Sequence, residues 1–204
     1  PMISSSRQHT LAGEATLEGI GLHTGVHAQL RIFAGEPNTG YVFVRTDLEG
    51  APEIPAHVSN VCETRRGTTL QFGEATVHTT EHVLADLYAS GIDNARLELN
   101  GPEVPILDGS ALPFMEAIET AGEAEQDEAR RFFKVRKNIS YRGENGVEML
   151  IVPLEGEEFK VTVMVDYNSP VLGTQHARME NLGAFKTSHS CSPVRIDLGR
   201  ILAR

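Results

Sequence analysis

The sequence predicts an α+β fold made of two similar domains with mainly antiparallel sheets, the second of them incomplete. Alternating apolar and polar residues indicate strands in both halves, and residues after 79 change to a helical period. A polar stretch over 121–128 separates the two patterned regions. We therefore expect a first domain over 1–122, a linker over 123–130 and a truncated second domain over 131–204.

The first half opens with three expected strands, over residues 10–18, 26–33 and 41–44. The last two are joined by a segment at 36–40 that contains Pro, Asn and Gly, which are typical of turns. Strands that follow one another through short turns predict an antiparallel meander.

An amphipathic helix is expected from residue 80. Four apolar residues fall on one helical face: Val83, Leu84, Leu87 and Tyr88. Thr79 or Thr80 can cap the start, and Gly91 stands where a helix would stop. Residues 95–99 then alternate as a further strand.

A second helix is expected over 111–121, after a loop rich in Gly and Pro at 101–109. Ser110 can cap this helix, and Pro113 is tolerated in its first turn. Gly122 ends it. This helix–strand–helix arrangement would cover the sheet of the first half.

The second half begins like the first. Strands are expected over 132–141 and 147–152, with a turn at 143–146 between them, and over 161–165. No helix–strand–helix pattern follows these strands, and residues 188–204 show no convincing period. The second sheet is therefore expected to lack its covering layer.

The composition indicates a globular protein without a transmembrane segment. No apolar run approaches the roughly 18 residues that a membrane-spanning helix needs. Residues 1–10 lack the basic-then-apolar layout of a secretory signal. Cys62 and Cys191 have no CxxC spacing, so neither a disulfide framework nor a cysteine zinc site is indicated. We therefore expect a cytoplasmic location.

The net charge of −10 argues against nucleic acid as a partner. Residues 1–122 hold 16 acidic residues against 6 arginines and no lysine. Such a surface repels phosphate backbones, and no basic stripe with interleaved aromatic residues is present.

The densest group of chemically active residues lies at 78–82, His-Thr-Thr-Glu-His. It matches the H-x-x-E-H pattern in which two histidines bind zinc and the glutamate acts as a base. That pattern requires helix throughout, whereas the two threonines favour a helix start, which leaves His78 outside. Glu81 and His82 then form a base and ligand pair in the first turn. The alternative is an ordinary helix start with an incidental histidine.

Two loops are weaker candidates. Three glycines surround His23 in the segment 19–25, and glycines allow a close approach of backbone to ligand. A glycine-rich turn with a partly buried histidine is the alternative interpretation. The loop 101–110 is interpreted as a rigid connection in which Asp108 bonds nearby backbone amides.

Taken together, these segments resemble the UDP-3-O-acyl-N-acetylglucosamine deacetylases of Gram-negative lipid A synthesis. The matching stretches run in the family's order: GIGLHTG at 19–25, ETRRGTTL at 63–70, TTEHVLA at 79–85, GIDNA at 91–95, GPEVPILDGSALPF at 101–114 and DYNSPVLG at 166–173. The resemblance implies two α+β domains, each a sheet packed on two helices, with the active site between them.

The resemblance also implies a substrate, a cofactor and roles for residues. The substrate would be a UDP-linked acyl-glucosamine and the cofactor Zn²⁺. Glu81 would be the general base and His82 a zinc ligand, while His78 would not bind the metal. His23 is the candidate substrate-binding residue.

The sequence departs from this family near its end. The remaining zinc ligands, a His and an Asp of an H-K-x-x-D helix, are expected beyond residue 204, so we expect a fragment without activity of its own. The family pattern stops at about residue 187, and we hypothesise an out-of-frame or mis-assembled tail from there. The alternatives are an inverzincin-like metallopeptidase that uses His78, and an inactive remnant or binding module.

Overall fold

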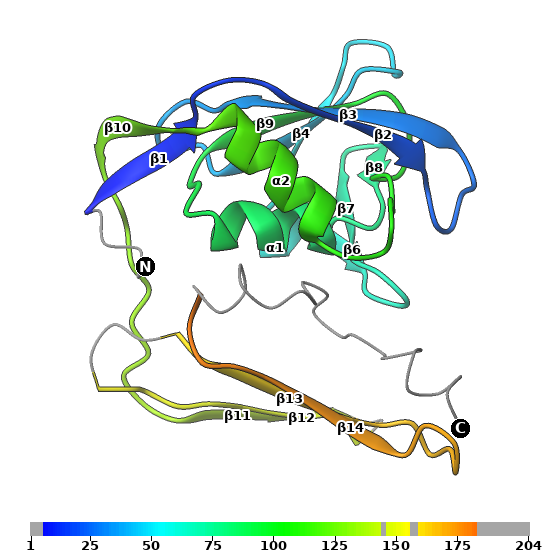
Figure 1. The fold of residues 1–204 in the computed structure, drawn as a ribbon, viewed down its shortest axis with the longest axis vertical. Coiled ribbons are helices and arrows are strands. Elements are labelled where there is room, and N and C mark those ends of the chain that lie inside the picture. Colours follow the sequence, from blue (N-terminus) through cyan, green and yellow to red (C-terminus); the bar gives the residue numbers. More distant parts are fainter. Residues whose placement is uncertain (1–5, 144–145, 156–158, 183–204) are drawn as a thin grey trace.

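The computed structural model describes residues 6–143, 146–155 and 159–182. Its first part contains a five-stranded sheet with the order β2-β3-β9-β4-β5 and two helices on one face of that sheet (Figure 1). The elements up to the first helix are β1 (Arg7–Leu11), β2 (Ala15–Ile20), β3 (His27–Ala34), β4 (Tyr41–Arg45), β5 (Glu53–Pro55), the 3-10 helix η1 (Val58–Asn60), β6 (Val61–Glu63), β7 (Thr69–Phe72) and β8 (Ala75–Val77). Those that follow are α1 (Glu81–Ala89), β9 (Ala95–Leu99), α2 (Leu112–Ala121) and β10 (Glu123–Ala129). This arrangement confirms the predicted α+β class.

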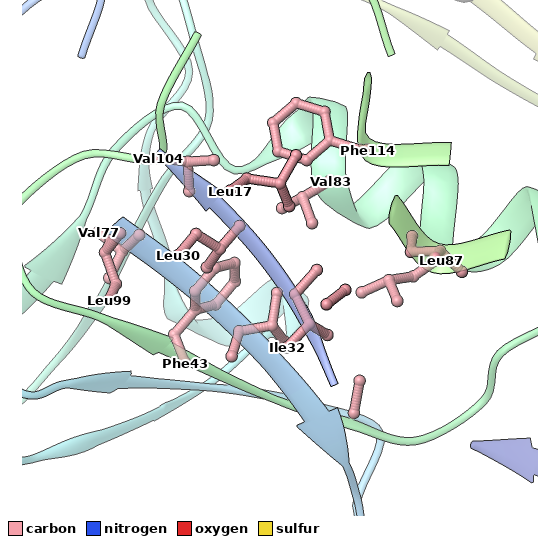
Figure 2. Close-up of a cluster of buried hydrophobic side chains, with 14 of the residues drawn as sticks. Leu17, Leu30, Ile32, Phe43, Val77, Val83, Leu87, Leu99, Val104 and Phe114 are labelled. Atoms are coloured by element: carbon pink, nitrogen blue, oxygen red, sulfur yellow. The ribbon is translucent and has the colours of Figure 1, made fainter. Parts of the chain in front are cut away.

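The sheet and both helices share one hydrophobic core (Figure 2). Buried side chains from these elements meet there: Leu17, Leu30, Ile32, Phe43, Val83, Leu87, Leu99 and Phe114. Val83 and Leu87 are fully buried and Leu84 is partly buried, as expected for the apolar face of α1, whereas Tyr88, expected on the same face, is exposed. Burying this face fixes the orientation of the helix and therefore the position of its first turn.

The predicted meander is wrong beyond its first pair of strands. β2 and β3 are antiparallel neighbours, but β9 lies between β3 and β4 and runs parallel to β4. Two hydrogen bonds at the start of β4 and β9 hold these strands side by side. Gly40 N donates to the side-chain oxygen Oδ1 of Asn94 at 2.8 Å, and Gly40 O accepts from Ala95 N at 3.0 Å. The apolar strand β9, with Leu97 and Leu99 fully buried, thereby takes a central position.

The strand expected over 10–18 is two strands. β1 ends at Leu11 and is not part of the five-stranded sheet, and the amide of Ala12 donates to Gly122 O at 2.9 Å. β1 then pairs antiparallel with β10, which occupies the segment expected to be a linker, 123–130. Backbone pairing needs no apolar side chain, so the polar composition of this segment did not reveal a strand. The division into domains stays a prediction.

Arg130 fastens the end of β10 to the first part. Its side chain is only 6% exposed and donates to the carboxylate of Asp93, with Nε 2.8 Å from Oδ1. It also donates to Gly91 O at 2.8 Å. A buried arginine with a carboxylate partner is a strong anchor for an edge strand.

The helix ends follow the predictions more closely than the helix starts. Gly91 and Gly122 terminate α1 and α2 with φ of +78° and +75°, a region that favours glycine. Ser110 is not the cap of α2, because Ala111 takes the N-cap position without a side-chain cap hydrogen bond, although Ser110 Oγ accepts from Leu112 N at 3.2 Å. No threonine side chain caps α1, because the hydroxyl of Thr80 donates to Thr68 O instead. Neither described helix is long and apolar enough to cross a membrane.

The second part consists of two antiparallel hairpins among its described residues. They are formed by β11 (Ile139–Arg142) with β12 (Glu148–Ile151), and by β13 (Val161–Asp166) with β14 (Thr174–Met179). The first hairpin and β13 confirm predicted strands, although β11 is shorter than expected and β14 was not predicted. Large apolar side chains, such as Tyr141, Met149 and Met164, are exposed. The predictions for residues 187–204 lie outside the described residues.

Candidate functional site

Glu81 is held at the first residue of α1 by a neighbouring backbone segment. Its Oε2 accepts a hydrogen bond from Thr68 N at 2.8 Å, and Thr68 O accepts from Thr80 N at 3.2 Å. The carboxylate also lies where the helix dipole favours negative charge. One oxygen is thus fixed by the backbone, and among the described residues no hydrogen bond engages Oε1.

Polar side chains from three segments converge at Gly67. A methyl group placed on this glycine would lie 3.3 Å from Glu81 Oε1, 3.6 Å from Thr79 Oγ1 and 3.7 Å from His23 Nε2. The structure therefore brings His23 and Glu81 together, although 58 residues separate them in sequence. A side chain at position 67 would contact all three groups, Glu81 Oε1 most closely.

The ring of His23 is held by a backbone carbonyl. Its Nε2 lies 3.1 Å from Arg66 O, and a carbonyl oxygen can only accept, so Nε2 is the donor in this contact. The loop itself is closed by a hydrogen bond from Gly25 N to Gly21 O at 3.0 Å.

His82 presents a buried nitrogen without a partner. Its Nδ1 has no hydrogen-bond partner among the described residues, an arrangement that is rare in folded proteins and needs a cause such as an ion or water. A bound metal would provide such a cause. Within the same residues, however, no group of three His, Cys, Asp or Glu side chains is placed to hold a metal ion. A catalytic zinc ion normally has three protein ligands, and His82 therefore supplies at most one of them.

His78 lies outside the helix, as predicted. α1 begins only at Glu81, and the preceding Thr79 has φ of +57°, so His78 and His82 do not share a helical face. Thr69 Oγ1 lies 3.0 Å from His78 Nδ1. This geometry does not support the zinc-binding H-x-x-E-H arrangement.

A cavity of about 400 Å³ opens beside Gly67. Its lining includes His23, Arg65, His78 and Thr79, but most of the surface that these residues turn toward it is apolar. The space reaches Gly67 and therefore lies beside Glu81 Oε1.

Comparison with known proteins adds the family. A family profile described as UDP-3-O-acyl N-acetylglycosamine deacetylase, LpxC, matches residues 8–191. The chain belongs to this family.

Relatives in the LpxC family share 41–49% identity with the chain. The bifunctional enzyme LpxC/FabZ of Chlorobaculum tepidum is 49% identical over 86% of this chain and 37% of its own length. That of Bacteroides thetaiotaomicron is 41% identical over 91% of the chain and 40% of its own. The UDP-3-O-acyl-N-acetylglucosamine deacetylase of Geobacter sp. is 42% identical over 85% and 56%. The chain thus spans about 37–56% of the length of these relatives.

Two buried carboxylates of this LpxC family member were missed by sequence reasoning. Glu103 belongs to the loop interpreted as a rigid connection, yet its carboxylate binds the loop of His23 and the side chain of Thr79. Asp86 lies one helical turn beyond His82 and is fully buried without a hydrogen-bond partner among the described residues. Burial raises the pKa of Asp86 to about 8. Glu103 lies in an expected loop and Asp86 in an expected helix, where acidic residues are usually exposed. The sequence therefore gives no signal that these two carboxylates are buried.

Proposed function

We propose that this chain carries the general base and one metal ligand of a zinc-dependent deacetylase that acts on UDP-3-O-acyl-N-acetylglucosamine in lipid A synthesis. Membership of the LpxC family and the name of the Geobacter relative support this substrate. The observation that carries the proposal is the convergence of Glu81 Oε1 and His23 Nε2 at Gly67, beside the cavity.

The reaction is the hydrolysis of an amide. Water attacks the acetamide carbon, a C–O bond forms, and the C–N bond breaks to release acetate and a free amine. Glu81 takes a proton from the attacking water at Oε1 and returns it to the leaving nitrogen. The hydrogen bond from Thr68 N occupies Oε2 and leaves Oε1 as the oxygen that can take the proton. His23, which lies near the same point, binds the substrate beside Gly67.

Zinc fits the unpartnered nitrogen of His82 but needs ligands from outside the described residues. When bound, the ion would polarise the acetamide carbonyl as a Lewis acid. The role of His82 is therefore to hold the ion next to the base, which the adjacent position of the two residues at the start of α1 allows.

The test compares three variants in the complete gene product that contains this chain. Glu81→Gln should retain zinc, measured by elemental analysis, and lose roughly 10²-fold or more of the deacetylation rate, the scale of a positioned general base. His82→Ala should lose zinc, whereas His78→Ala, the matched control for zinc binding, should retain it. Zinc loss in His78→Ala would favour the metallopeptidase alternative. Near-normal turnover in Glu81→Gln would show that the base lies elsewhere.

A further inference from the structure

Glu103 is a buried carboxylate that gathers donors from two separate loops. It is 1% exposed. Oε2 accepts from Thr24 N and Thr24 Oγ1, both at 2.8 Å, and both oxygens lie 3.1 Å from His23 N. Oε1 accepts from Thr79 Oγ1 at 2.6 Å. Four donors therefore surround one carboxylate.

These donors belong to the two segments that carry the proposed substrate-binding and base residues. His23 and Thr24 form the first segment, and Thr79 stands two residues before Glu81. The backbone strengthens the second link, because Val104 N donates to His78 O at 3.1 Å and His78 N donates to Pro102 O at 2.9 Å. Glu103 thus links the segment of His23 and Thr24 to the segment of Thr79 and Glu81.

Thr79 shows why this bond matters for Glu81. A β-branched residue with φ of +57° is strained, and such a conformation persists only where the surroundings impose it. The hydroxyl of Thr79 is bound to Glu103, and this bond helps to hold the backbone in the conformation from which α1 begins. Without it, Thr79 could relax and the first turn of α1 would shift.

We propose that Glu103 is a positioning residue that sets the distance between His23 and Glu81 by holding both of their loops. The inference rests on the proposed function of these two residues. Thr24 transmits the effect to the substrate-binding side, and Thr79 transmits it to the base. Gly21 is part of the same device, because a side chain at that position would collide with Glu103 Oε2.

The charge of Glu103 is stabilised where it stands. Burial alone would raise the pKa of Glu103, but the hydrogen bonds from Thr79, Thr24 and His23 together hold it below its ordinary value. The carboxylate therefore accepts at both oxygens at neutral pH. The positioning role depends on how far the Glu103 side chain extends and on its acceptor oxygens. It does not depend on an electrostatic effect of the Glu103 charge on the substrate.

Two threonine substitutions separate the two sides. Thr79→Val keeps the branched shape and loses the hydroxyl, so kcat should fall about 10- to 100-fold, the scale of a misplaced catalytic group, with KM little changed. Thr24→Val should raise KM more than it lowers kcat. Thr79→Ser, which keeps the hydroxyl, should restore most of the rate. Thr16→Val is the matched control, because Thr16 makes the same kind of bond, to Glu14 at 3.1 Å, on an exposed surface.

Two substitutions of Glu103 test reach against charge. Glu103→Asp keeps the charge but withdraws the carboxylate, whereas Glu103→Gln keeps the reach and an acceptor oxygen. A positioning role requires the larger loss of rate in Glu103→Asp. The reverse order, or equal changes of kcat and KM in Thr24→Val and Thr79→Val, would overturn the proposal.

A second measurement keeps this test independent of the proposed function. Nitrogen-15 NMR of the chain reports the tautomer of His23 and the amide of Thr68, which donates to Glu81. Glu103→Asp should move both signals even if no deacetylase activity is found. Unchanged signals from both residues would overturn the positioning role, and absent activity with shifted signals would overturn only the function.

Discussion

Asp86 should make the stability of this protein fall as the pH rises. Its side chain is fully buried in α1, both carboxylate oxygens lack partners among the described residues, and burial raises the pKa from 3.8 to about 8. The folded state therefore binds this proton more tightly than the unfolded state. The stabilising contribution of the protonated group is complete below pH 3.8 and is lost as the pH rises toward 8.

The magnitude follows from proton linkage. Within the window between the two pKa values, each pH unit changes the free energy of unfolding by about 1.4 kcal/mol. Between pH 5 and pH 7 the wild type should therefore lose about 2–3 kcal/mol relative to Asp86→Asn, which carries no charge at any of these pH values. Urea unfolding followed by circular dichroism suits this measurement, since the chain has no tryptophan.

Asp47→Asn is the matched control. Its carboxylate is bound by Arg45 at 2.7 Å, a hydrogen bond that lowers the pKa of Asp47. The stabilising contribution of ionised Asp47 is complete above the pKa that Asp47 has in the unfolded chain. It is lost only as the pH falls through the lower pKa of Asp47 in the folded protein. Asp47→Asn should therefore differ from wild type by a constant amount between pH 5 and pH 7. A constant difference for Asp86→Asn as well would show that Asp86 is already charged in the folded protein at pH 5.

Three further predictions concern packing. Leu87→Ala should lower the free energy of unfolding by about 2–5 kcal/mol, because this fully buried side chain joins α1 to the core, and a urea titration would measure it. Arg130→Ala should release β10, so hydrogen exchange of the amides at 123–129 should accelerate while the central strand β9 stays protected; equal acceleration in both would contradict the anchoring role. Gly21→Ala should destabilise the fold by about 1–3 kcal/mol, because the new methyl group meets Glu103, and an unchanged melting temperature would rule out that contact.

Local signals made both helices and several strands predictable from sequence, whereas the strands β10 and β14 and the pairing of the strands were not. Gly91 and Gly122 end helices because a left-handed conformation depends on one residue, and this is visible in a sequence. The place of β9 between β3 and β4 depends on Asn94, whose side-chain oxygen accepts a hydrogen bond from Gly40 N, 54 residues away in sequence. No local pattern carries that pairing.

The candidate site divides in the same way. Glu81 and His82 could be selected from a helix start, since a capping pattern and a motif coincide there. Glu103 could not, because its role depends on donors 79 and 80 residues away in sequence, at Thr24 and His23. A buried carboxylate is recognised only when its donors are known, and the sequence around Glu103 resembles an ordinary turn.

The pairing of β1 with β10 changes where the first structural unit ends. The polar segment after α2 is neither exposed coil nor a simple spacer, because it pairs with β1, and Arg130 continues into the buried contact with Asp93. A chain cut at residue 122 would remove this strand and leave β1 with an unpaired edge. An unpaired edge strand invites association with other chains. A stable first unit should therefore extend to at least Arg130. The two hairpins described after it depend most on further contacts, because each is a sheet of only two strands that exposes large apolar side chains.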